Sequence, residues 1–114
     1  MSLSTEVKGL LTSIDNVYIG TLPPTIDNCI AFFYTGGLPR GLTESKLKQP
    51  TFQIRVRNTS YSAAETLCDT IDDILHGHTD ANILLIRAMG DKIPIGRDAN
   101  NRQEFTMNYK SYYR

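Results

Sequence analysis

The sequence predicts an α+β fold: a mostly antiparallel sheet with two helices packed on one face. Three observations support this prediction: segments of strict apolar–polar alternation, apolar stripes at helical spacing, and the order of these patterns along 114 residues. The chain passes from helix to strands, then to a second helix and further strands. This order is typical of α+β domains. The length favours a single domain, residues 1–114, around one core.

The clearest unit is a strand, a helix and a second strand. Residues 51–57 alternate, which predicts a half-buried strand with Arg55 and Arg57 on its polar face. A helix follows, which we expect to begin with a capping box of Ser62 and Glu65 and to end at Gly77. Residues 82–89 form a short apolar run and predict an interior strand. The helical stripe consists of Ala64, Leu67, Cys68, Ile71, Ile74 and Leu75.

The N-terminal part predicts a short amphipathic helix and two strands. The helix lies within residues 3–14 and takes Ser2 or Ser4 as its cap. A brief strand at residues 17–19 precedes a longer one at residues 28–35, which is apolar on both faces and is closed by two glycines.

The remaining segments predict one long loop, one turn and one strand. The polar segment at residues 36–49 has the length of a binding loop or a mobile loop. Residues 98–101 have turn chemistry, and residues 102–113 alternate as the last strand. Because two strands are apolar on both faces and only two helices are available, the second face needs cover. A folded-over sheet or another copy of the chain would supply it.

Composition excludes several classes of protein. Twelve basic and twelve acidic residues give a formal net charge of zero, so no global charge attracts nucleic acid or a membrane. No apolar run reaches the roughly 18 residues that span a bilayer, and no signal peptide is recognised. Cys29 and Cys68 lie in a strand and on the helical stripe, and we expect two buried free thiols in a reducing cytoplasm.

A search for catalytic and metal-binding patterns finds little. His76, His78 and Asp80 are residues of the kinds that bind metal ions. A structural role explains them better, because His76 lies at the end of a helix, where an imidazole interacts favourably with the helix dipole, and His78 lies in an exposed turn. The glycine-rich segment 36–41 lacks the ending of a phosphate loop. Neither cysteine has a nucleophile's sequence context. We therefore expect no enzyme activity, cofactor or metal.

The second helix carries four acidic residues without a basic partner on its own polar face. Repulsion between these acids lowers the stability of the helix by tenths of a kcal/mol. Residues that lower local stability without a local benefit often have a functional role. A solvated face is the simplest interpretation. Alternatively, the acids meet a basic surface on a neighbouring copy or on another protein. The acids are Glu65, Asp69, Asp72 and Asp73, and the basic candidates are Arg40, Lys46, Lys48, Arg55 and Arg57.

Several segments together resemble the minor capsid proteins of tailed bacteriophages, specifically the tail terminators of long-tailed phages. They are residues 50–57, the helix start at residues 61–64, and residues 93–98 and 102–108. The similarity covers most of the chain from about residue 30. Asp98, Arg102 and Glu104 belong to its most recognisable segment, and they serve either the hairpin or a subunit contact.

The resemblance implies a structural virion protein made in the host cytoplasm. Such a protein forms a ring, typically a hexamer, that caps the tail tube and joins it to the head-side connector or stopper protein. DNA passes through the ring without sequence-specific binding, and the family has no membrane, cofactor or catalytic residues. In such a ring, the acids of the second helix would meet a basic surface on a neighbouring copy or virion partner, or they would face the DNA passage. The alternatives are another neck component such as a head-completion protein, a non-viral interaction module, and a small metal-dependent enzyme.

Overall fold

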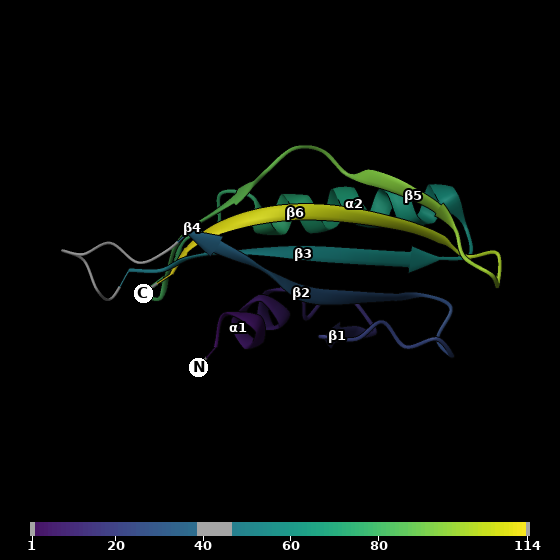
Figure 1. Cartoon of the computed structure of the whole chain (residues 1–114), viewed down its shortest axis with the longest axis horizontal. Coiled ribbons are helices and arrows are strands. Elements are labelled where there is room, and N and C mark those ends of the chain that lie inside the picture. The colour runs from purple at the N-terminus through teal and green to yellow at the C-terminus, as the bar shows by residue number, and fades with distance from the viewer. Residues whose placement is uncertain (1, 39–46, 114) are drawn as a thin grey trace.

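The computed structural model describes residues 2–38 and 47–113, which form two helices and one six-stranded sheet (Figure 1). The strand order is β1-β2-β3-β6-β4, and β5 also pairs with β6. β1 is parallel to β2, whereas the other pairings are antiparallel, so the predicted mostly antiparallel α+β fold is confirmed. The elements are α1 (Leu3–Leu10), β1 (Val17–Ile19), β2 (Cys29–Leu38), β3 (Gln49–Asn58), α2 (Tyr61–Leu75), β4 (Ile83–Ala88), β5 (Ile93–Arg97) and β6 (Gln103–Tyr113).

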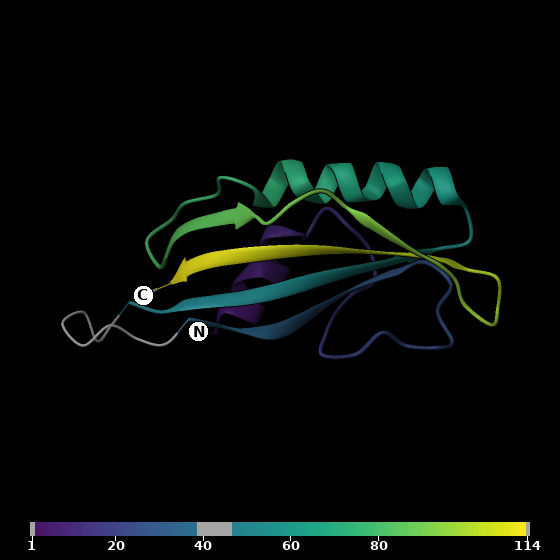
Figure 2. The same cartoon turned by 45° about the horizontal axis from the view of Figure 1, so that its top comes forward.

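Both helices pack on the same face of the sheet, as predicted. α2 lies behind β6 in Figure 1 and is clear of the strands in Figure 2, where α1 lies behind the sheet. α2 packs on β3 and β6, and α1 packs on β1 and β2. Their apolar stripes and the inward residues of the strands form one core, because alternation places every second residue of a strand on the same side. The rings of Phe32, Phe52 and Tyr109 stack across three neighbouring strands, with centroids 4.9 and 5.3 Å apart. The predicted stripe of α2 is confirmed, with Ala64, Cys68, Ile71 and Leu75 buried.

The helix caps differ in part from the predicted ones. Ser2, one of the two predicted candidates, caps α1 and accepts a hydrogen bond from the backbone N–H of Thr5. The predicted Ser62–Glu65 capping box is wrong, because α2 begins two residues earlier, with Ser60 accepting from the N–H of Ala63. Gly77 follows the end of α2 with φ at +82°, the left-handed conformation that glycine adopts without strain.

The two glycines of β2 continue the strand and do not close it. Gly36 and Gly37 pair with Thr51 and Pro50, after a register shift that begins at Tyr34. A Cβ atom at Gly37 would lie 2.3 Å from the carbonyl oxygen of Gln49, so only glycine fits this close approach. β2 and β3 therefore extend into both ends of the loop that was predicted at residues 36–49. Residues 39–46 of this loop lie outside the described residues.

Residues 82–89 were expected to form an interior strand, and this prediction is wrong. β4 lies at the end of the strand order. Its outer edge is covered by the turn after α2, where the N–H of Gly77 donates to the Ile86 carbonyl (2.7 Å) and the Ile86 N–H donates to the His78 carbonyl (3.1 Å). This cover explains why an edge strand has an apolar sequence.

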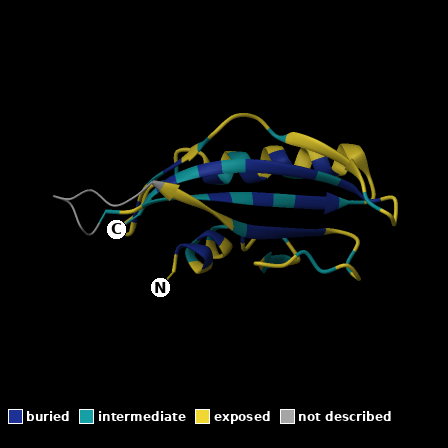
Figure 3. Cartoon of the chain, in the orientation of Figure 1, coloured by how far each residue is buried: buried dark blue, intermediate teal, exposed yellow. Residues whose placement is uncertain are grey.

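The face of the sheet turned away from the helices carries mainly polar residues on β3 and β6, and we call it the open face. Buried and half-buried residues alternate along these two strands (Figure 3). At one end the segment containing Pro23 and Ile26 covers it, and the Cys29 thiol lies 3.6 Å from the Ile26 carbonyl oxygen. Elsewhere it carries amides and hydroxyls, including a hydrogen bond of 3.2 Å from Gln53 to Asn108. The described residues form one sheet, so no folded-over sheet covers the rest of this face, and cover by another copy of the chain stays a prediction. The molecule measures 49 × 24 × 24 Å. Within the described residues, no helix has the length and apolar character needed to cross a membrane.

Candidate functional site

The outward face of α2 carries three exposed carboxylates in one column, which we call the acidic column: Glu65, Asp69 and Asp73. They follow each other at four-residue steps and therefore lie above one another on the helix. The Asp69 carboxylate accepts a hydrogen bond of 2.9 Å from Lys92, and this contact raises the pKa of Lys92. Asp69 therefore has a basic partner from outside the helix, which the sequence analysis did not identify. Glu65 and Asp73 make no hydrogen bond or ion pair within residues 2–38 and 47–113.

The fourth acid of α2, Asp72, lies beside this column and turns toward the sheet. Its carboxylate accepts a hydrogen bond of 2.9 Å from the hydroxyl of Tyr109, a fully buried side chain. Burial, together with the adjacent carboxylate, raises the pKa of Tyr109. Asp72 therefore stabilises the contact between α2 and β6.

The open face carries three cations, Arg55, Arg87 and Lys110. Arg87 and Lys110 are directly opposite each other on β4 and β6, and Lys110 alternates with the buried Tyr109. Like charges in this position repel each other. None of the three makes an ion pair with a described acid. The open face therefore holds repulsion that nothing in the described chain relieves.

Aromatic rings support two of these cations. The guanidinium carbon of Arg55 lies 5.6 Å from the ring centroid of Phe33, and the Lys110 nitrogen lies 5.2 Å from that of Tyr112. Cation–π contacts at such exposed sites are worth about 0.5–1 kcal/mol. Arg55 also donates a hydrogen bond of 3.0 Å to Gln53. These contacts hold the charges in place without neutralising them.

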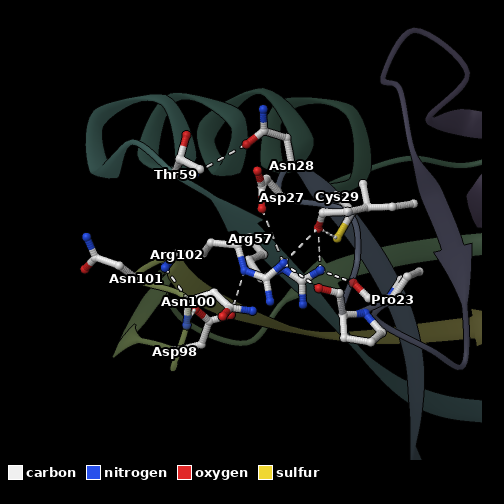
Figure 4. Close-up of polar contacts among 12 residues, drawn as sticks. Pro23, Asp27, Asn28, Cys29, Arg57, Thr59, Asp98, Asn100, Asn101 and Arg102 are labelled. Carbon is white, nitrogen blue, oxygen red and sulfur yellow. Dashed lines mark hydrogen bonds and ion pairs between the residues drawn. The ribbon is translucent and has the colours of Figure 1, made fainter.

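Arg57 was predicted to share this basic face, and that prediction is wrong. Its side chain is only 3% exposed and donates hydrogen bonds to the carbonyl oxygens of Pro23 and Ile26 (Figure 4). Arg102, 4% exposed, lies beside it and donates to the carbonyl of Pro24 at 2.8 Å. Two buried guanidinium groups thus hold this segment against the sheet, and we call them the arginine clamp.

Asp98 anchors the clamp from the turn between β5 and β6. Its carboxylate accepts hydrogen bonds of 2.9 Å from both the backbone N–H and the side-chain Nε of Arg102, and one of 3.0 Å from the N–H of Asn100. These donors, led by the backbone N–H of Arg102, lower the pKa of Asp98. Asp98 and Arg102 therefore serve the hairpin and the covering segment.

The other predicted charged residues lie apart from the clamp. Glu104 is half-buried on the open face, where it faces Arg57 across the β3–β6 pairing. Lys48 is exposed and pairs through its backbone with Tyr113 at the end of the sheet. Arg40 and Lys46 lie outside the described residues.

The histidine segment after α2 has structural contacts. His76 accepts a hydrogen bond of 3.0 Å from the N–H of Ala88, and His78 lies 3.0 Å from the Asp80 carboxylate. Among the described residues, no three His, Cys, Asp or Glu side chains are placed to hold a metal ion. Both cysteines are free and buried, as predicted, and burial raises the pKa of Cys68 to about 12.

β5 presents an exposed apolar edge that the sequence analysis did not single out. Every residue of this strand is exposed, and Ile93 and Ile95 keep 50% and 52% of their surface. Met89, just before it, is 56% exposed. The described residues offer no backbone partner to the outer edge of β5, and Pro94 has no N–H to donate.

Comparisons with known proteins agree with this architecture. The structure is similar to a chain from the “Virion of native gene transfer agent (GTA) particle”, with a TM-score of 0.68 and 11% identity, covering 98% of this chain and 94% of that one. A second solved chain has a TM-score of 0.59 and 13% identity, covering 98% of this chain and 87% of its own. No curated protein matches the sequence. Residues 6–113 match the family described as “Bacteriophage tail terminator protein”. The chain therefore belongs to the bacteriophage tail terminator family, the structural virion proteins that its sequence resembles.

Proposed function

We propose that this tail terminator acts as a ring of identical copies, six in the simplest case, that caps the tail tube and joins it to the head-side connector at the neck of the virion. The observation that carries the proposal is the family match across residues 6–113, nearly the whole chain. We propose that residues 1–114 form one domain that works by contact with other virion proteins.

The arrangement of surfaces supports a ring. α2 packs on one face of the sheet, so the acidic column and the open face lie on opposite sides of the molecule (Figures 1 and 2). One surface is an acidic helix and the other is a sheet face with three cations. Two unlike surfaces on one protomer favour head-to-tail contacts, which close into a ring when the rotation between copies allows it. The exposed edge of β5 adds an apolar surface for the tube, the connector or the next copy.

DNA passes through such a ring without sequence-specific contact. A formal net charge of zero supports this view, because tight binding to duplex would need a strong excess of basic residues. We propose assembly in the host cytoplasm, with no membrane, cofactor or catalytic step.

The test is to remove the protein from the phage that encodes it and to image the particles. We expect full heads without attached tails, and tail tubes that lack a capped end. Adding the purified chain to these tubes should restore caps and attachment. Heads that lose DNA while capped tails accumulate would instead indicate a head-completion protein. Normal particles would contradict the proposal.

A further inference from the structure

We infer that the open face binds the acidic column of a second copy of this chain, as the head-to-tail contact of the ring. The inference rests on the proposed function and names the surfaces that meet. The two surfaces carry opposite charges, and on each surface some of these charges have no ion-pair partner among the described residues. Arg87 and Lys110 repel each other across two strands of the open face, and Glu65 and Asp73 lack a partner in the described chain. Bringing the two surfaces together relieves both.

The charges also match in spacing. Glu65 and Asp73 are eight residues apart on a helix, which places them about 12 Å apart along its axis. On the open face, Arg55 pairs with Thr106, and Lys110 lies four residues further along β6, about 14 Å away. A helix laid along β6 therefore brings its two free carboxylates near Arg55 at one end and near the Arg87–Lys110 pair at the other.

The middle of each surface is matched as well. Between the two free acids lies Asp69, whose charge is already neutralised by Lys92. Between the cations, the open face carries the amides of Gln53 and Asn108, which hydrogen-bond to each other and bear no charge. Thus the charged ends of one surface face the charged ends of the other, and neutral groups meet at the centre. Phe33 and Tyr112, half-buried beside the cations, provide aromatic area for the contact.

A neighbouring copy fits this face better than DNA does. The open face carries Glu104 beside its three cations, and a surface that holds phosphates tightly would retain DNA that must pass. A second copy presents two free carboxylates, Glu65 and Asp73, whose charge is opposite to that of these cations. The two surfaces lie on opposite sides of one protomer, so each copy binds one neighbour with each surface.

The test uses complementary charge reversals. One variant carries Glu65→Lys and Asp73→Lys, the other Arg55→Glu and Lys110→Glu, and a control carries Lys8→Glu and Asp15→Lys, two exposed charges of α1 and the following loop. Circular dichroism and thermal unfolding establish that each variant is folded. The readout is the protein concentration at which half of terminator-free tail tubes are capped, counted by electron microscopy.

We expect each reversal alone to need at least tenfold more protein than wild type, and the control to behave as wild type. An equimolar mixture of the two reversals should recover capping, because copies alternate around the ring and every contact again joins opposite charges. Raising the salt concentration should weaken wild-type capping, since exposed charges are screened within about 8 Å at physiological ionic strength.

Other results overturn the inference in distinguishable ways. Wild-type protein that never caps tubes refutes the proposed function. If wild type caps and both reversals cap equally well, the function stands and this contact is wrong. Normal capping by the Arg55 and Lys110 variant with altered DNA release would assign the open face to DNA. Two inactive reversals that stay inactive when mixed would also refute the contact.

Discussion

Arg55 and Arg57 lie two residues apart on the same face of β3, yet they have opposite environments. Arg55 lies half-buried over the ring of Phe33, on a part of this face that no other described segment covers. Arg57 is 3% exposed and donates its hydrogen bonds to backbone carbonyls of the segment before β2. Alternation along the strand predicts the same exposure for both, and only the segment above Arg57 makes the difference.

Charged side chains therefore have two different roles in this fold: some stabilise it, and others are available for binding. A buried guanidinium that satisfies carbonyl groups holds the chain together, because removing it leaves polar groups without partners away from water. A cation on an open face contributes little to stability and is free to bind a partner. The same division separates Asp72, bonded to Tyr109, from Glu65 and Asp73 in the acidic column.

The largest expected effect comes from breaking the arginine clamp. Arg57→Ala should lower the free energy of unfolding by about 3 kcal/mol, because the carbonyls of Pro23 and Ile26 lose a buried charged donor. The matched control Arg55→Ala should change it by no more than about 0.5 kcal/mol. Urea unfolding followed by circular dichroism measures both. Equal losses for the two arginines would contradict the distinction.

A second experiment tests whether the arginine clamp holds the segment containing Pro23 and Ile26 against the sheet. Cys29 lies beneath the segment held by the clamp, with its thiol near the Ile26 carbonyl, whereas Cys68 lies on the buried side of α2. Burial raises the pKa of both thiols, so both should react slowly with a thiol reagent at pH 8. Arg102→Ala should speed the labelling of Cys29 severalfold and leave Cys68 protected. Mass spectrometry of labelled peptides distinguishes the sites, and simultaneous exposure of both thiols would mean global unfolding instead.

A smaller effect is expected at the contact between α2 and β6. Tyr109→Phe removes the hydroxyl that donates to Asp72 and should cost about 1 kcal/mol of unfolding free energy. Tyr61→Phe is the control, since Tyr61 is 45% exposed and its hydroxyl makes no hydrogen bond to a described residue. No loss for Tyr109→Phe would show that Asp72 is satisfied by water alone.

The smallest effect concerns pH. The pKa of Asp98 is lowered in the folded protein, so its contribution to stability is complete above the pKa of the unfolded chain, near 4. This contribution is lost as the pH falls through the lower folded pKa. Asp98→Asn should therefore be less stable than wild type at pH 7 and should lose less stability on acidification. Parallel pH profiles for the two proteins would contradict this role.

Patterns local in sequence predicted most of the fold. The alternation of β3 and β6, the stripe of α2 and the turn at residues 98–101 depend on neighbouring residues and were confirmed. The position of β4 at the edge was missed, because the backbone of residues 77–78 covers it and an apolar sequence alone does not reveal that cover. The capping box failed because a nearby serine, Ser60, competes for the same role.

Site residues were harder to predict, because their roles depend on contacts distant in sequence. The acids of α2 were identified, but the Lys92–Asp69 pair spans 23 residues and the Tyr109–Asp72 bond spans 37. Arg57 is covered by a segment 31–34 residues away. Arg87 and Lys110 could have been found by placing their strands side by side, but the pairing of β4 with β6 requires the strand order, which the sequence does not give.

Cryo-electron microscopy of the virion neck would show directly whether the acidic column of one copy binds the open face of the next. The account predicts a ring of copies of this chain at the end of the tail tube, with α2 of each copy against the open face of the next. In that ring Glu65 and Asp73 should lie within ion-pair distance of the neighbour's cations, while Arg57 keeps its contacts within its own chain. A ring whose open faces line the DNA passage, with the acidic columns in solvent, would contradict the account.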